Sequence, residues 1–296
     1  MPAYNAANYI AESIESVINQ SYPYWELLVV DDGSTDDTAA IIKRFELTDQ
    51  RVKYLFQQNG RQGKARNLGI QNSGGKYIAF LDADDKWTSD KLTIQTKLLS
   101  ADTNTDLHFA QGYSLTGNQV EDYDVDVKPI WNSNNFIDFV QQNRIPILSV
   151  LIKKEALLQA GGFTEDENIQ NVEDYHLWLK LLISNKVFKS TADRLFYYRI
   201  HTNQSTFQNQ NTAAPIFHVY GNLLKTCQDD KVGQILMGKL KWYIFRPEFH
   251  AECLEIIITH LNNKGKALIA FIIKKLFAGP AYIQQKLAFK LVSVFG

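Results

Sequence analysis

The sequence predicts an α/β fold in which a mostly parallel sheet is flanked by helices, followed by a helical C-terminal region. Up to residue 100, short apolar runs alternate with segments of helical periodicity, and crossovers between parallel strands produce this alternation. Beyond residue 212 the pattern is helical and shows no further strand. A chain of 296 residues is long enough for one large α/β domain with an appendage.

The N-terminal part of the chain supplies the clearest elements. Residues 9–18 place Ile10, Ile14 and Val17 on one helical face. Acidic residues at Asp36 and Asp37 favour the first turn of a second helix. The expected elements of this part are helices at 9–18, from 36 onward and at 65–71, and strands at 26–30, 52–56 and 77–81.

The second half of the chain is less regular. Residues 116–135 contain four acidic residues among Asn and Gly, which is typical of an exposed excursion. We expect residues 202–212, rich in Gln and Asn, to link a domain at 1–205 to a helical region at 213–296. Further elements are expected as strands at 149–152 and 195–200 and helices at 154–160 and 175–184.

Composition excludes several classes of protein. Hydrophobic residues make up 45% and charged residues 21%, as in ordinary globular proteins. The net charge of −1 gives no electrostatic argument for nucleic-acid binding. Two cysteines are too few for a disulfide scaffold and lack zinc-ligand spacing, so a reducing compartment is expected. No run of about 18 uncharged apolar residues predicts a membrane span.

Acidic residues follow two of the predicted strands. Asp31 and Asp32 end the strand at 26–30, and Asp82 and Asp84 follow the strand at 77–81. Open α/β sheets form their ligand crevice at the carboxyl ends of strands. Because Mg²⁺ and Mn²⁺ bind carboxylates together with substrate phosphates, these clusters suggest a metal-bridged diphosphate.

Other interpretations of these residues remain open. Aspartates at strand ends also serve as turn and helix-capping residues. Lys64 and Arg66, after a loop with two glycines, can contact phosphate or form a solvated face. The chain has no Gly-x-x-x-x-Gly-Lys-Ser/Thr loop and no Gly-x-Gly-x-x-Gly after a strand, which disfavours P-loop and dinucleotide-binding proteins.

Taken together, five strings resemble glycosyltransferase family 2, in order and at the usual spacings over residues 1 to 205. They are Pro2-Ala3-Tyr4-Asn5, Val30-Asp31-Asp32-Gly33-Ser34, Ala65-Arg66-Asn67-x-Gly69, Leu81-Asp82-Ala83-Asp84-Asp85 and Glu173-Asp174 before Leu177-Trp178. The resemblance implies a GT-A fold and a nucleotide-diphosphate sugar donor, most often a UDP-sugar. It also implies an inverting transfer to a hydroxyl group that depends on Mn²⁺ or Mg²⁺.

The resemblance assigns a role to each matching residue. Pro2, Tyr4 and Asp32 would line the nucleoside pocket, with Arg66 against the nucleotide. Asp82 would approach the ribose or the metal, and Asp84 would coordinate the cation that bridges the phosphates.

The same resemblance makes Asp174 the base that takes the proton of the acceptor hydroxyl, with Glu173 in support. His201, in a Tyr-Arg-x-His element, would approach the metal or the diphosphate. Without the upstream motifs, Glu173 and Asp174 are better explained as residues that favour a helix N-terminus.

We therefore expect a glycosyltransferase of bacterial surface polysaccharide or glycolipid synthesis. Its partners would be a nucleotide-sugar donor and a saccharide or lipid-linked saccharide acceptor, with no nucleic acid. Two alternatives are a catalytically silent nucleotide- or sugar-binding module and a sugar nucleotidyltransferase. The second usually has a Gly-rich basic loop near the N-terminus, which is not present here.

The two ends of the chain carry further expectations. Family members normally have a short apolar strand directly before Pro-x-Tyr-Asn, so we expect a first strand truncated by about five to seven residues. Residues 256–296 contain six Lys and no Asp, Glu or Arg. The stretch 264–296 could form an interfacial helix pair on anionic lipid, or a helical cap on the domain or a dimer partner. The expected location is cytoplasmic, with peripheral contact to the plasma membrane.

Overall fold

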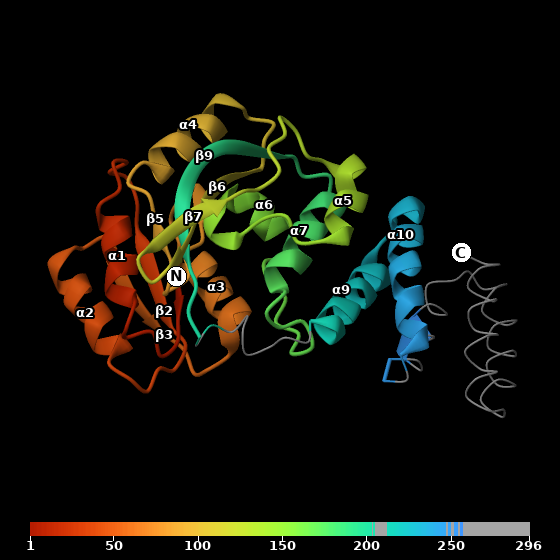
Figure 1. Cartoon of the computed structure of the whole chain (residues 1–296), viewed down its shortest axis with the longest axis horizontal. Helices are drawn as coiled ribbons and strands as arrows, with labels where there is room; N and C mark the ends of the chain where they lie inside the picture. The colour runs from red at the N-terminus through yellow and green to blue at the C-terminus, as the bar shows by residue number, and fades with distance from the viewer. Residues whose placement is uncertain (203, 205–211, 247, 250–251, 254, 257–296) are drawn as a thin grey trace, which may run out of the picture. The chain divides into compact units, whose positions relative to one another are not determined.

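The computed structural model describes residues 1–202, 204, 212–246, 248, 249, 252, 253, 255 and 256. The chain divides into two compact units, Met1–Gln210 and Asn211–Gly296. The first unit contains two sheets and helices α1 to α7, and the described part of the second unit is helical (Figure 1). The boundary lies close to the one expected from the Gln- and Asn-rich stretch.

The first sheet is parallel, as the sequence predicts. Its strand order is β1-β2-β3, with β1 at Pro2–Ala3, β2 at Leu27–Asp31 and β3 at Val52–Phe56. All five residues of β2 are buried, which fits the continuous apolar runs of strands covered on both faces. Helices α1 (Ile10–Ile18) and α2 (Thr38–Thr48) lie beside this sheet (Figure 1), and α3 (Arg61–Asn72) packs on β1 and β2.

The second sheet is mixed, and most of its strand pairs are antiparallel. Its order is β4-β8-β6-β9-β5, and β7 pairs with β6. Of these pairs, β6 with β9 is parallel, and the others are antiparallel. The strands are β4 at Tyr77–Ala79, β5 at Lys86–Trp87, β6 at Leu107–Thr116, β7 at Gln119–Tyr123, β8 at Leu151–Lys153 and β9 at Phe188–Arg199. The α/β class is therefore as expected, while the mostly parallel arrangement is limited to β1–β3 and the β6–β9 pair.

The second half of the domain differs from the sequence expectations in its strands. Part of the expected excursion at 116–135 is β7, which forms a hairpin with β6. The long curved strand β9 begins at Phe188, seven residues before the predicted start (Figure 1). Helices α6 at Lys154–Gln159 and α7 at Glu173–Ile183 lie close to their predicted positions. Helices α4 at Lys91–Ala101 and α5 at Phe136–Gln141 were not predicted individually.

The topology brings the acidic strand ends together. The segment after β4 contains Asp82 to Asp85 and leads into β5, which pairs with the end of β9. In that position the backbone N–H of Arg199 donates to Asp85 Oδ1 over 2.8 Å. The Arg199 Nε donates to the Asp84 carbonyl, also over 2.8 Å. The end of β9 therefore fixes the Asp-rich segment and delivers His201 to it.

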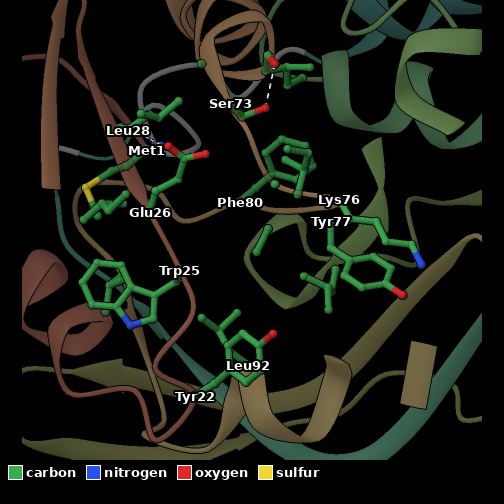
Figure 2. A pocket seen from close by; sticks show the side chains of 18 of the residues that line it. Met1, Tyr22, Trp25, Glu26, Leu28, Ser73, Lys76, Tyr77, Phe80 and Leu92 are labelled. Atoms are coloured by element: carbon green, nitrogen blue, oxygen red, sulfur yellow. Dashed lines mark hydrogen bonds between the residues drawn. The ribbon is translucent and has the colours of Figure 1, made fainter. Parts of the chain in front are cut away.

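A slot separates the two sheets on the N-terminal side of β1. It is a cavity of about 610 Å³ lined by residues of β2 and β4 and by Met1. Figure 2 shows Met1, Leu28 and Trp25 on one side of the slot and Phe80 and Tyr77 on the other. The indole Nε1 of Trp25 is buried and has no hydrogen-bond partner within the described part of the chain.

The amino group of Met1 closes one end of this slot. It donates to the Leu28 carbonyl over 2.9 Å, and Val30 donates in turn to the Met1 carbonyl. Burial lowers the pKa of this amino group to about 5.

The described residues of the second unit form helices α9 (Ala213–Thr226) and α10 (Asp230–Leu240), followed by a 3₁₀ helix at Lys241–Phe245. Asp229 caps α10 by accepting from the Val232 N–H over 2.9 Å. None of the helices described is long and apolar enough to cross a bilayer. The basic stretch 264–296 lies outside the described residues, so its expected membrane contact remains untested.

Candidate active site

A cavity of about 540 Å³ lies at the carboxyl ends of β1 and β2 and beside the segment after β4. Its wall contains six of the nine residues predicted from the sequence, namely Pro2, Tyr4, Asp32, Asp82, Asp84 and His201. Lys64, Arg66 and Asp174 lie outside this wall. The expectation that acidic strand ends share one crevice is therefore met in the structure.

Asp32 organises one side of the cavity. Its Oδ1 accepts from the Gly60 N–H and the Gln57 side-chain amide, and its Oδ2 accepts from the Arg61 N–H, each over 2.7 Å. Arg61 has a left-handed backbone with φ of 69°, a strained conformation for a residue with a side chain. The carboxylate of Asp32 therefore holds the loop before α3 against the end of β2.

Tyr4 and its neighbour form another part of the wall. Tyr4 is 53% exposed, so its ring is accessible for stacking. Asn5 also has a left-handed backbone, with φ of 49°, and its Oδ1 accepts from the Thr35 N–H over 2.8 Å. This contact ties the loop after β1 to the loop after β2.

Arg66 bridges two acidic segments behind the cavity. Its Nη2 donates to Asp82 Oδ1 over 2.8 Å, and its Nη1 donates to Glu173 Oε1 over 2.7 Å. The Arg66 and Glu173 side chains are only 5% and 8% exposed, whereas Asp82 is 30% exposed towards the cavity. Arg66 therefore connects the cavity wall to the N-terminus of α7, where Asp174 lies.

Asp84 and His201 form the opposite corner of the cavity. The Asp84 Oδ2 lies 3.0 Å from the His201 Nε2. The His201 ring packs at 4.7 Å from the ring of Tyr9, and its Nδ1 is buried with no partner in the part of the chain that the structure describes. Burial, and then the charge of Asp82, raises the pKa of Asp84.

These residues suit a divalent cation completed by substrate oxygens. The carboxylates of Asp82 and Asp84 repel each other, and a cation would relieve this repulsion. Imidazole and carboxylate together are suitable ligands for Mn²⁺. No group of three or more His, Cys, Asp or Glu side chains converges on a metal site among the described residues. The protein would therefore supply few ligands, as is common when the substrate is a diphosphate.

Asp174 lies in the first turn of α7, and its pKa is raised to about 6. Burial is the main cause, followed by the charge of Glu173, while Arg66 acts in the opposite direction. The Asn143 Nδ2 donates to the Asp174 Oδ2 over 2.9 Å. Asp174 thus contacts the loop after α5, while Arg66 and Glu173 connect its helix to the cavity.

The structure also shows residues that the sequence interpretation did not include. Arg61 and Tyr9 line the cavity, and Asn143 contacts Asp174. The position of Arg61, in the polar stretch 57–63 where α3 begins, was the one signal available for it. Lys64 is exposed on α3, away from the cavity wall, so its predicted contact with phosphate is not supported by its position.

The family model for glycosyl transferase family 2 matches residues 1–157. The chain belongs to this family. The match covers β1 to β8 and includes the cavity residues up to Asp84. The resemblance drawn from the five sequence strings is confirmed, and so is the class of enzyme, a glycosyltransferase.

Two curated family members illustrate the range of relatives. The putative teichuronic acid biosynthesis glycosyltransferase TuaG of Bacillus subtilis is 32% identical over 74% of this chain and 84% of its own length. An uncharacterized glycosyltransferase of Rickettsia bellii is 35% identical over 71% of this chain. The match to the Rickettsia protein spans only 30% of that protein's length.

A solved structure of S. aureus TarS, residues 1–349 in complex with UDP-GlcNAc, has the same fold. It superposes with a TM-score of 0.67 at 17% identity, over 99% of this chain and 89% of the TarS chain. The mannosyltransferase PcManGT of Pyrobaculum calidifontis, in complex with GDP-Man and Mn²⁺, gives a TM-score of 0.59 at 18% identity, over 99% of this chain and 84% of that chain. These likenesses confirm the expected GT-A fold.

Replacing Arg66 with Met should strongly destabilise the domain, because it leaves Glu173 buried and Asp82 without its ion-pair partner. We expect the free energy of unfolding in urea to fall by about 3–5 kcal/mol. The control is Lys53→Met, which breaks an exposed pair with Glu26 and should cost less than about 1 kcal/mol. Similar losses for the two variants would show that the Arg66 bridge is not essential to the fold.

Proposed function

We propose that this family member is an inverting, metal-dependent glycosyltransferase that moves a sugar from a UDP-sugar to a hydroxyl acceptor. The observation that carries the proposal is the buried bridge from Asp82 through Arg66 to Glu173. It fixes the cavity suited to the donor relative to Asp174, the carboxyl group suited to act as a base. One side of the site can therefore hold the leaving group while the other activates the nucleophile.

The donor's nucleoside part would lie against Pro2, Tyr4 and Asp32. The exposed Tyr4 ring can stack on the base. Asp32 already accepts three hydrogen bonds from the loop before α3, and a carboxylate can accept about four. Its Oδ2 retains a free position for a ring N–H. Arg61, on the same wall, adds a positive charge close to the expected position of the phosphates.

The diphosphate would face Asp82, Asp84 and His201, which would hold Mn²⁺ or Mg²⁺. When bound, the cation would stabilise the negative charge that develops on the leaving diphosphate. Asp84 and His201 are already held by the end of β9 and by contact with Tyr9, so these two donors are positioned before any ligand binds.

Asp174 would take the proton of the acceptor hydroxyl. The hydroxyl oxygen forms a bond to the anomeric carbon while the bond from that carbon to the diphosphate oxygen breaks. The electron pair leaves with UDP, and the proton passes to the Asp174 carboxylate. A single displacement of this kind inverts the anomeric configuration. A pKa of about 6 makes Asp174 a better base than an ordinary carboxylate while keeping it ionised at neutral pH.

Relatives support a pathway in which the acceptor is a bacterial surface saccharide. The name of TuaG refers to teichuronic acid synthesis. A second relative, 34% identical over 63% of this chain, is the UDP-Glc:alpha-D-GlcNAc-diphosphoundecaprenol beta-1,3-glucosyltransferase WfgD of Escherichia coli. By analogy, we infer that this protein transfers a hexosyl or N-acetylhexosaminyl group to a saccharide on a lipid carrier at the cytoplasmic membrane face. Residues 264–296 would be available for contact with that surface.

Two substitutions should separate the roles of donor binding and proton transfer. Asp174→Asn should lower transfer by about 10²–10⁴-fold while leaving the affinity for UDP nearly unchanged. Asp84→Ala should weaken UDP binding in the presence of Mn²⁺ by ~10-fold or more and remove its sensitivity to EDTA. Calorimetry with UDP and a transfer assay with UDP-sugars measure these effects.

Glu155→Gln, an exposed position on α6, is the matched control for both substitutions. The opposite pattern, with Asp174→Asn losing UDP and Asp84→Ala retaining it, would overturn the assignment of roles. A wild-type protein that binds UDP but releases no product with any donor would instead favour the silent binding module.

The pH dependence of transfer should report the ionisation of Asp174. Because the pKa of this group in the folded protein is about 6, the ionised base is lost as the pH falls through 6. With saturating donor, the rate should decrease about tenfold for each pH unit below that value. UDP affinity measured over the same range separates this effect from donor release. A rate that stays constant down to pH 4.5 would contradict the role of Asp174.

A further inference from the structure

The loop that follows α5 is held close to the N-terminus of α7. The buried indole of Trp178, on α7, donates to the Ile145 carbonyl over 3.2 Å. Arg144 donates from Nε to the Asp138 carbonyl over 2.8 Å and forms an ion pair with Asp126. The loop is therefore joined to α7 by a contact that does not involve Asp174 itself, and Arg144 ties it to α5 and to Asp126.

Asn143 lies in this loop, and both ends of its amide are in use. Its Oδ1 accepts from the Ile145 N–H over 3.3 Å, and its Nδ2 donates to the Asp174 Oδ2 over 2.9 Å. If the Asn143 amide were flipped, its Oδ1 would lie against the Asp174 Oδ2, and two acceptors cannot form a hydrogen bond. The surrounding contacts therefore select one orientation of the amide. The other oxygen of Asp174 accepts from the Tyr175 N–H over 2.7 Å.

Asn143 also borders a second cleft, which is separate from the donor cavity. This cleft has a volume of about 430 Å³ and is lined by residues 123–126 and 142–146. Its wall combines the Tyr123 ring with the carboxylates of Asp124 and Asp126, which are 69% and 53% exposed. An aromatic face together with exposed carboxylates suits a ligand rich in hydroxyl groups.

We propose that Asn143 is a positioning residue for Asp174: its amide holds the carboxylate towards the cleft formed by residues 123–126 and 142–146, from which the acceptor hydroxyl approaches. This inference rests on the proposed role of Asp174 as the base. It adds a residue that lies outside the five family strings and a direction of approach for the acceptor saccharide.

The charged groups around Asp174 set the pH at which its carboxyl group ionises, and removal of the Asn143 amide should change that pH. Burial raises the pKa of Asp174 most, the charge of Glu173 on α7 raises it further, and Arg66 on α3 lowers it. Tyr123 on β7 borders the cleft, and its own pKa is raised by burial and then by the Asp174 charge. The Asn143 N–H stabilises the ionised carboxylate. Its loss should raise the pH at which Asp174 becomes ionised.

The test compares Asn143→Ala and Asn143→Asp with wild type and with Gln141→Ala, a matched exposed amide at the end of α5. We expect the acid limb of the transfer rate to move up by about one pH unit in Asn143→Ala, and further in Asn143→Asp, because a second carboxylate replaces the donor. UDP affinity should be unchanged, and the melting temperature should fall by only a few degrees, because a higher pKa of an ionised group in the folded state costs some stability at neutral pH. Gln141→Ala should match wild type.

A second measurement does not depend on activity. The Asp174 carboxyl band is titrated by infrared difference spectroscopy, with Asp174→Asn as the blank, in wild type and in Asn143→Ala. The same upward shift supports the proposal. An unchanged titration in Asn143→Ala would overturn the role of Asn143 alone, even if Asp174 is the base. Full transfer by Asp174→Asn would instead overturn the base itself, and with it the proposed function.

Discussion

The buried guanidinium of Arg66 is the contact on which the arrangement of this site depends. Asp82 and Glu173 come from distant parts of the chain, and both pair with the Arg66 guanidinium, whose side chain is only 5% exposed. A buried ion pair gives little net stability, because desolvation of the charges offsets their attraction. It does restrict geometry, since two carboxylates can approach only where the cation lies between them. The relative positions of the donor cavity and the α7 N-terminus follow from that restriction.

The second sheet provides the frame for the opposite corner of the cavity. The pairing of β9 with β6 and β5 carries Arg199 to the Asp-rich segment, where it donates to backbone and side-chain oxygens of Asp84 and Asp85. Burial raises the pKa of Asp85 well above its usual value. The segment therefore concentrates acidic groups that are costly to ionise, and a bound cation would lower that cost.

Sequence patterns predicted the N-terminal part of the domain well, because each of its elements has a strong local signal. The strand at 52–56 has the same bounds in the structure, and α1 begins one residue after the expected position. The sequence pattern was weaker for strands whose position depends on pairing with other strands. Strand β6 mixes His, Gln, Gly and Ser with apolar residues and was not predicted, yet it pairs with β7, β8 and β9. Four of the five residues of its hairpin partner β7 are exposed. The sequence of β7 therefore resembles that of a loop.

The sequence by itself determined the family, the α/β class and the identity of the acidic residues at the strand ends, because these depend on short strings and local periodicity. Only the tertiary structure decided which of those residues share a cavity. Arg66 was expected against the nucleotide, and the structure shows it buried between Asp82 and Glu173; Lys64 lies outside the cavity wall, and Asn143 reaches Asp174. Such contacts depend on how separate segments pack, and the free energy of a buried charge or hydrogen bond is set by partners that no local pattern specifies.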